Sequence, residues 1–95
     1  MDQALTHGDW LAAFIGQELV IELVEGFTVF GTLAALGPAH IELRDADLHS
    51  QQEANSSRDV YALETKQIGI RPNRTRLFLP RERIIALARL EDIAP

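Results

Sequence analysis

The chain contains no cysteine, which excludes disulfide bonds, thiolate metal sites and cysteine nucleophiles. It also has no apolar run near the roughly 18 residues that a membrane-spanning helix requires. The first ten residues have neither the basic segment nor the apolar stretch of a secretory signal, so a cytoplasmic location is expected. With 46% hydrophobic residues in a length of 95, the composition predicts one small globular domain over residues 1–95.

Positive charge is missing from the first part of the chain. Residues 1–43 contain six acidic residues and no Lys or Arg, although the whole chain has nine basic residues and a net charge of −5. Segment 66–83 reverses this balance, because six basic residues stand there against one acid, Glu82. Such a cluster predicts either a solvated charged face or an anion-binding face. Its basic residues are Lys66, Arg71, Arg74, Arg76, Arg81 and Arg83.

A short N-terminal helix is predicted after residue 6. Thr6, with Asp9 three residues later, is a polar helix start, and Trp10 and Phe14 follow at helical spacing before Gly16. A helix this short is not stable alone. Trp10 and Phe14 are therefore expected to pack on the mouth of a barrel, and the alternative is a stripe that docks a partner.

Alternation of period two begins at residue 18 and indicates β-strands. Glu25-Gly26 predicts a tight hairpin between the first two strands. Gly31 lies inside the second strand, where it predicts a bend or a close approach of another backbone. The apolar run at 84–90 fits a strand or a helix by period, and its adjacent isoleucines favour a strand. The expected strands cover about 18–24, 27–36, 40–44, 76–79 and 84–90.

The middle of the chain has the weakest pattern. Residues 50–57 are polar and show no period, which predicts a mobile loop. Residues 60–63 are apolar enough to extend the sheet, although Gly69 and Pro72 soon interrupt the pattern.

Residues 15–26, followed by Gly31 and Leu33, resemble the first motif of the Sm-like (Lsm) family. The strand that begins at His40 and the junction at 77–84 also lie where that family has its corresponding elements. The resemblance is to a divergent bacterial-type member of the family. It covers most of the chain except about residues 49–73. It implies a mainly β fold in which a short N-terminal helix precedes a five-stranded, strongly bent antiparallel small barrel. Residues 49–73 would form a long variable loop between strands 3 and 4.

The same resemblance implies the partners of the protein. Members of the family assemble into hexameric or heptameric rings by pairing the fourth strand of one subunit with the fifth strand of the next. Such rings bind single-stranded RNA, often uridine-rich, around the central pore. A homo-oligomeric ring that binds single-stranded RNA is therefore the expected assembly.

The RNA-binding positions of the family carry different residues in this chain. Gly37 stands near the family's aspartate, His40 near its asparagine, and Pro80-Arg81 in place of its Arg-Gly pair. By position, His40 can stack on or hydrogen-bond to a base, while Arg81 and Arg83 can hold phosphate or stack on a base plane. The additional residues expected to attract phosphate are Arg71, Arg74 and Arg76.

Two alternatives remain open. The first is a ring-forming assembly or scaffold protein that has lost the RNA site. The second is a metal-dependent enzyme that uses His40, Asp45, Asp47 and His49. Strand alternation places His40 on the opposite face from the other three residues unless the strand contains a bulge. Because no catalytic motif accompanies these side chains, neither an enzyme nor a cofactor is expected.

Overall fold

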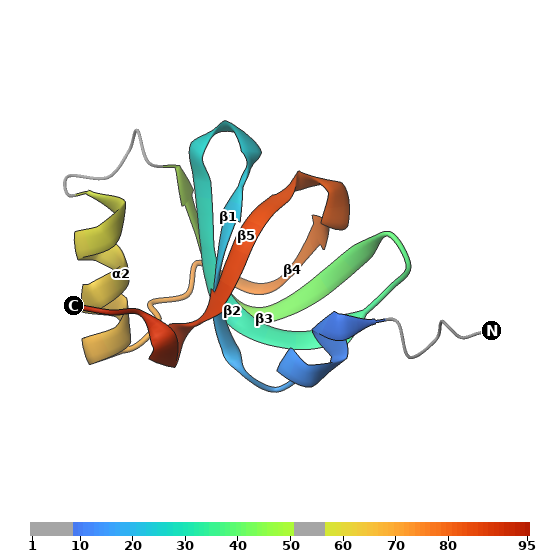
Figure 1. Ribbon diagram of the computed structural model, residues 1–95, viewed down its shortest axis with the longest axis horizontal. Coiled ribbons are helices and arrows are strands. Elements are labelled where there is room, and N and C mark those ends of the chain that lie inside the picture. Colours follow the sequence, from blue (N-terminus) through green and yellow to red (C-terminus); the bar gives the residue numbers. More distant parts are fainter. Residues whose placement is uncertain (1–8, 51–56) are drawn as a thin grey trace.

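The computed structural model describes residues 9–50 and 57–95, which form one sheet, one α-helix and short 3₁₀ helices (Figure 1). The strands are β1 (Glu18–Leu23), β2 (Phe27–Leu36), β3 (His40–Ser50), β4 (Arg74–Pro80) and β5 (Ile84–Arg89). The helix α2 (Arg58–Ile68) lies between β3 and β4 in the chain. The 3₁₀ helices are η2 (Trp10–Phe14), η3 (Val24–Gly26), η5 (Arg81–Arg83) and η6 (Leu90–Asp92). Among these described helices, none is long and apolar enough to cross a membrane.

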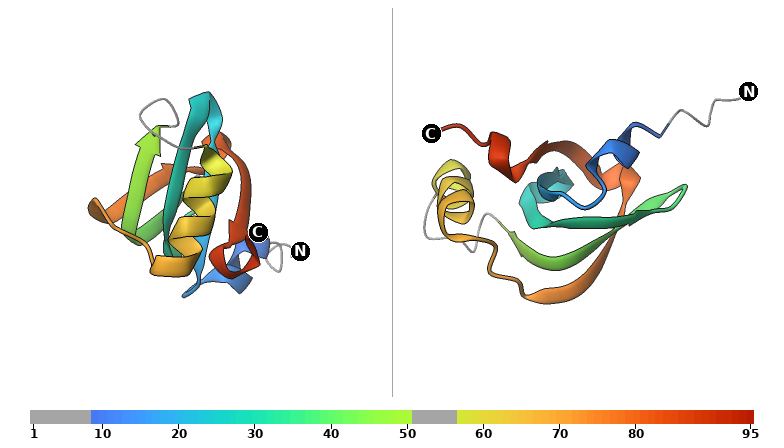
Figure 2. Two further views of the ribbon diagram at one scale, coloured as in Figure 1. Left: turned by 90° about the vertical axis from the view of Figure 1, so that its left-hand side faces the viewer. Right: turned by 90° about the horizontal axis from the view of Figure 1, so that it is seen from below.

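The five strands form a single antiparallel sheet in the order β4-β3-β2-β1-β5, which confirms the predicted fold class. Seen from below in the right-hand view of Figure 2, the sheet is strongly curved. In the part of the chain that the structure describes, β4 pairs only with β3 and β5 pairs only with β1. These two strands are therefore the edges of the sheet.

The predicted bend at Gly31 is confirmed. The register between β2 and β3 shifts directly after Phe30. A Cβ atom placed on Gly31 would lie 3.2 Å from the Cβ atom of Ala46 on β3, which is closer than side chains normally approach. Asp45, beside this contact, has a φ of +51°, as expected of an irregular strand position. A glycine at residue 31 thus lets β2 and β3 approach each other closely where the sheet curves.

Strand alternation divides the buried side chains between two cores. Leu19 and Ile21 of β1 point into the barrel, whereas Val20 points to the other face. The barrel core consists of Leu11, Leu19, Ile21, Val29, Leu33, Ile41, Leu43, Ala46 and Leu79. The second cluster, which we call the helix-side core, consists of Val20, Phe30, Ala62 and Leu90. Because Ala62 belongs to α2, the second core attaches this helix to the outer face of the sheet.

The N-terminal helix differs from the prediction in its start and in the side chain that it buries. The helix η2 begins after Asp9, whose carboxylate accepts a hydrogen bond from the backbone N–H of Leu11, while residue 6 lies outside the described residues. Leu11 is buried against the barrel core and Phe14 packs at its margin. Trp10 is 63% exposed and its ring is nearly perpendicular to that of Phe14, so the prediction that it packs on the barrel is wrong.

The region after β3 contains a helix where the sequence predicted a variable loop and a strand. β3 continues to Ser50, and residues 60–63 lie in α2, so the expected extension of the sheet is wrong. Local capping explains the outcome: the Ser57 hydroxyl accepts a hydrogen bond from the Val60 N–H, and Gly69 ends the helix with a φ of +98°. The expected mobile loop at 50–57 lies mostly outside the described residues.

Candidate nucleic-acid interface

The predicted RNA-binding residues His40 and Arg81 lie at the same corner of the barrel. β3 begins where β4 ends, because His40 lies opposite Pro80 in the antiparallel pair. The backbone N–H of Arg81 donates a hydrogen bond to the carbonyl of Ala39, at a distance of 2.9 Å. The β2–β3 turn and the β4–β5 junction therefore form one continuous surface.

Arg81 is held by groups of its own chain. Its Nε donates to the carbonyl of Gly37 at 3.0 Å, and its two terminal nitrogens contact the Asp9 carboxylate at 2.7 and 3.2 Å. These hydrogen bonds hold the pKa of Asp9 below its usual value, and the same pairing raises the pKa of Arg81. Arg81 thus joins the N-terminal helix to the β2–β3 turn, and an RNA phosphate would have to share its guanidinium. Its role as an RNA ligand stays a prediction.

His40 and Arg83 are more accessible than Arg81. The His40 ring is exposed and meets the ring of Phe78 edge-on, with 5.8 Å between the ring centroids. A Cβ atom on Gly37 would lie 2.5 Å from the His40 ring, so the glycine leaves room for the imidazole. Arg83 is exposed in η5, and among the described residues its side chain has no hydrogen-bond or ion-pair partner. Both side chains are thus open to a ligand, and Arg83 can reach one without giving up a hydrogen bond or ion pair within the described residues.

The other three predicted arginines do not join this corner. Arg71 and Arg74 lie near the start of β4, roughly 20 Å along the strand from Pro80 at a rise of about 3.3 Å per residue. Arg71 stacks over the ring of Tyr61, and Arg74 donates to the carbonyl of Asn73. The structure therefore places five of the six predicted residues in two groups at opposite ends of β4.

Arg76 lies between these groups and is partly neutralised. Its Nε and that of Arg44 both contact the same Glu42 carboxylate oxygen, at 2.9 and 2.7 Å. The hydrogen bond from Arg44 is the main cause of a lowered pKa for Glu42. The Arg76 guanidinium also lies over the ring of Phe78, at 5.1 Å from its centroid. The outer face of the β3–β4 pair is thus less positive than its arginines suggest.

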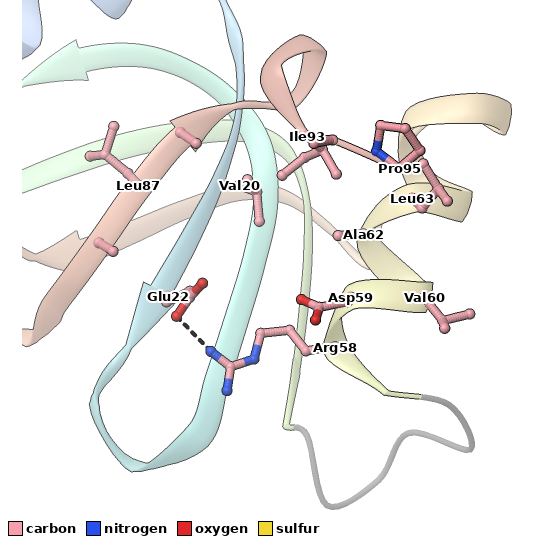
Figure 3. Close-up of a pocket in the computed structure, with 13 residues that line it drawn as sticks. Val20, Glu22, Arg58, Asp59, Val60, Ala62, Leu63, Leu87, Ile93 and Pro95 are labelled. Carbon is pink, nitrogen blue, oxygen red and sulfur yellow. Dashed lines mark hydrogen bonds and ion pairs between the residues drawn. The ribbon is translucent and has the colours of Figure 1, made fainter.

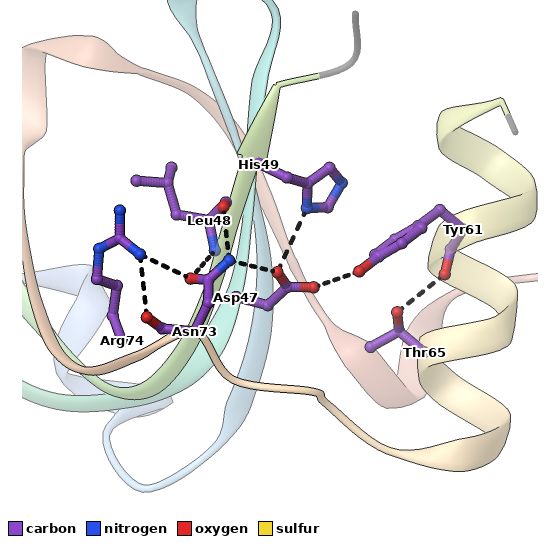
Figure 4. Close-up of polar contacts among 7 residues, drawn as sticks. All are labelled: Asp47, Leu48, His49, Tyr61, Thr65, Asn73 and Arg74. Carbon is purple, nitrogen blue, oxygen red and sulfur yellow. Dashed lines mark hydrogen bonds and ion pairs between the residues drawn. The ribbon is translucent and has the colours of Figure 1, made fainter. Parts of the chain in front are cut away.

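A buried polar network connects β3 to α2 (Figure 4). Asp47 is only 4% exposed, and its carboxylate accepts hydrogen bonds from the Tyr61 hydroxyl at 2.5 Å and from the Asn73 amide at 3.2 Å. The Nδ1 atom of His49 lies 3.6 Å from the same carboxylate, beyond hydrogen-bond distance, and is buried without a partner among the described residues. Burial, followed by the bond to Asp47, raises the pKa of Tyr61.

This network was not predicted from the sequence. The sequence signal for it was a pair of residue types that often start and end a helix, Ser57 and Gly69. Together they would have predicted α2 and placed Tyr61 on a helix. The contacts of Tyr61 with Asp47 and Asn73 have no sequence signature, because they depend on where the helix packs.

The structure does not bring together the side chains considered for the metal-dependent alternative. His40 and His49 lie near opposite ends of β3. Within residues 9–50 and 57–95, no group of three His, Asp or Glu side chains is close enough together to hold a metal ion. The described residues therefore offer no support for a metal-dependent reaction.

Replacing Asp9 by alanine is expected to lower the free energy of unfolding by about 1 kcal/mol at neutral pH, because the helix loses its cap and Arg81 its partner. The folded-state pKa of Asp9 is lowered, so its contribution is present above the ordinary carboxyl pKa of about 4 and is lost as pH falls further. Denaturant unfolding should show the deficit near pH 7 and little of it near about pH 2.5. Glu91→Ala, at an exposed position, is the control; an equal deficit at both pH values would contradict the expectation.

Comparison with known proteins finds the same fold in solved structures. No family model and no curated protein sequence matches the chain. An Sm protein of Pyrococcus abyssi, solved in complex with a uridine heptamer, is 13% identical, with a TM-score of 0.58 over 93% of this chain and 99% of that one. An SmAP (LSm) protein of Methanococcus vannielii is 18% identical, with a TM-score of 0.54 over the same shares.

A third similar structure comes from a different setting. A chain in the crystal structure of the NatC complex bound to CoA is 20% identical, with a TM-score of 0.54 over 81% of this chain and 79% of that one. Together with the five-stranded bent sheet and its N-terminal helix, these likenesses show that the chain has the Sm fold. The neighbours do not test the expected bacterial-type subclass, which stays a prediction.

Proposed function

We propose that the protein assembles into a homo-oligomeric ring that binds single-stranded RNA at its pore. The observation that carries the ring is the pair of open edges, β4 and β5, at opposite ends of one sheet. Both edges bear large apolar side chains in contact with water, since Phe78 is 50% and Ile85 is 65% exposed. Unpaired strand edges of this kind favour association.

Pairing β4 of one subunit with β5 of the next is a head-to-tail contact, which closes into a ring when the rotation between subunits permits. Every subunit then covers both of its edges. Solved proteins of the same fold support this arrangement, because an Sm protein of P. aerophilum is a heptamer at a TM-score of 0.52 and 13% identity. The subunit number of the present ring is not assigned.

The corner formed by His40, Arg81 and Arg83 supports RNA binding. It combines an exposed imidazole with a guanidinium that has no partner among the described residues. Imidazole and guanidinium groups stack on unpaired bases, and arginine also attracts phosphate. The P. abyssi Sm protein was solved with a uridine heptamer, which makes a U-rich oligonucleotide the first ligand to test.

Fluorescence anisotropy with a labelled U-rich oligonucleotide tests the RNA site. Arg83→Ala is expected to weaken binding several-fold and to reduce the slope of log affinity against log salt by about 0.7 for each phosphate that the variant no longer neutralises. Arg74→Ala is the matched control, because Arg74 lies at the other end of β4 and should have the smaller effect. Equal effects of the two variants would contradict binding at the proposed corner.

A scaffold ring without RNA is the second candidate. The ion pair between Asp9 and Arg81 favours the scaffold, because Arg81 is the arginine nearest to the family's RNA-binding position and its guanidinium is already bound by Asp9. The similar chain within the NatC complex shows that this fold also occurs inside a multi-protein complex. Native mass spectrometry separates the candidates: the scaffold predicts a ring whose mass is unchanged by U-rich or A-rich oligonucleotides.

A further inference from the structure

An apolar groove of about 550 Å³ lies between α2 and the edge strand β5, on the outer face of the sheet (Figure 3). Ala86 and Ala88 of β5 line it, together with Val20 from β1 and Leu63 from the helix. Val20 lies opposite Ala88, and Val20 belongs to the helix-side core, so both alanines share the outer face. The small side chains leave the groove open directly beside the unpaired edge.

The other edge of the sheet carries a matching side chain. Leu77 and Leu79 of β4 pack on the barrel core, and Phe78 between them therefore points to the outer face. Phe78 is 50% exposed although it is a large aromatic residue. One edge thus presents a half-exposed ring, which Arg76 and His40 of the same chain also contact, and the other presents a groove lined by alanine.

Pairing of the two edges would bring these features together. On both edges the inward side chains are apolar: Leu77 and Leu79 on β4, Ile84 and Leu87 on β5. A β4–β5 pair that keeps these side chains away from water must place them on the same side of the extended sheet. Phe78 of one subunit then lies on the same face as Ala86 and Ala88 of the next.

The charges near the two features are also complementary. Arg74 and Arg76 precede Phe78 on the same face of β4. The groove carries two carboxylates, Glu22 and Asp59, against one guanidinium, Arg58, which contacts Glu22 at 2.5 Å. In this pairing, a groove with a net negative charge would lie against a strand with positive charge. The complementary charges favour pairing β4 with β5 over edge-to-edge contact between two copies of β4.

We propose that the α2–β5 groove is the receptor for Phe78 of the neighbouring subunit, so that Phe78 fixes the contact between subunits. The proposal rests on the ring proposed above and specifies which side chains hold it together. It also assigns a role to α2, which forms one wall of the groove, in assembly.

Cysteine pairs give a direct test, because the chain contains no cysteine of its own. Phe78→Cys is mixed with Ala86→Cys or, separately, with Ala88→Cys, and the mixture is refolded together and mildly oxidised. We expect a disulfide-linked dimer on a non-reducing gel from at least one mixture. No single variant should form one, because the proposed contact places residue 78 of one subunit against residue 86 or 88 of the next and never against another copy of itself. Phe78→Cys mixed with Phe27→Cys, which is 39% exposed on β2, is the control.

A second variant keeps the test decisive if Phe78→Cys weakens the ring. Ala86→Trp fills the groove at an exposed position, so the single chain should still fold and keep the wild-type circular dichroism spectrum. Native mass spectrometry is expected to show loss of the ring. If the wild-type protein is a ring, but no cysteine mixture cross-links and the Ala86→Trp variant still forms the ring, the groove proposal alone is overturned. The groove is then open to another protein. A monomeric wild-type protein overturns both proposals.

Discussion

Replacement of Asp47 by alanine is expected to detach α2 from the sheet at a cost of about 2 kcal/mol. The variant leaves the Tyr61 hydroxyl without its acceptor and removes one of the partners of the Asn73 amide. A buried polar group without a partner typically costs about 1–3 kcal/mol. The effect should be local, because the barrel core lies on the opposite face of the sheet and contains none of these side chains.

Two measurements follow this change separately. Amide hydrogen exchange should accelerate over residues 58–68 and stay slow over β1 and β2. Tyr61 is the only tyrosine of the chain, so an ultraviolet pH titration reports its pKa alone. That pKa is raised in the wild type and should fall in Asp47→Ala, because the bond to the carboxylate is gone.

The raised pKa of Tyr61 also determines how the stability of the folded protein changes at high pH. Folding favours the neutral phenol, so its contribution to stability is present below the ordinary tyrosine pKa of about 10 and is lost as pH rises beyond it.

Glu64→Ala, exposed on the same helix, is the control for the hydrogen-exchange experiment on Asp47→Ala. Uniform acceleration over the whole sheet would contradict a local role for Asp47.

Truncation of Phe30 should have the largest effect on stability. Phe30 is fully buried in the helix-side core, and its ring contacts those of Tyr61 and His49, with centroid distances of 5.6 and 5.9 Å. Phe30→Ala removes these contacts and leaves a cavity, which costs about 3–5 kcal/mol. For a domain of this size, such a loss lowers the melting temperature by more than about 10 °C.

Phe27→Ala is the matched control, because Phe27 lies on the same strand and is 39% exposed. Its effect on the melting temperature should be much smaller. Thermal unfolding followed by circular dichroism compares the two variants. A small loss for Phe30→Ala, similar to that expected for Phe27→Ala, would show that the helix-side core contributes little to the stability of the fold.

Alternation in the sequence was enough to predict the barrel strands. Leu19 and Ile21 both enter the barrel core, because a period of two places them on one face whatever lies around them. Gly31 identified the bend for a similar reason, since a strand rarely tolerates glycine unless another backbone comes close. The N-terminal helix was only partly predicted: helical spacing placed Trp10 and Phe14 near each other but could not show which side chain the barrel would bury.

The candidate site was predicted by position more than by chemistry. His40 and Arg81 do meet at one corner, because β3 pairs with β4 at that end. Arg71 and Arg74 do not join them, since a cluster of charges in the sequence becomes a line about 20 Å long on an extended strand. The closeness of charges along the chain is therefore a poor guide to closeness in a sheet.

The sequence by itself determined the strands and the bend, because these depend on local period and on glycine. Only the tertiary structure decided which polar groups are paired. Asp9 and Arg81 are 72 positions apart, and Asp47 and Tyr61 meet only because α2 packs on the outer face. Such contacts depend on how distant segments are placed in space. The same dependence explains why the groove beside β5 is visible only in the folded chain.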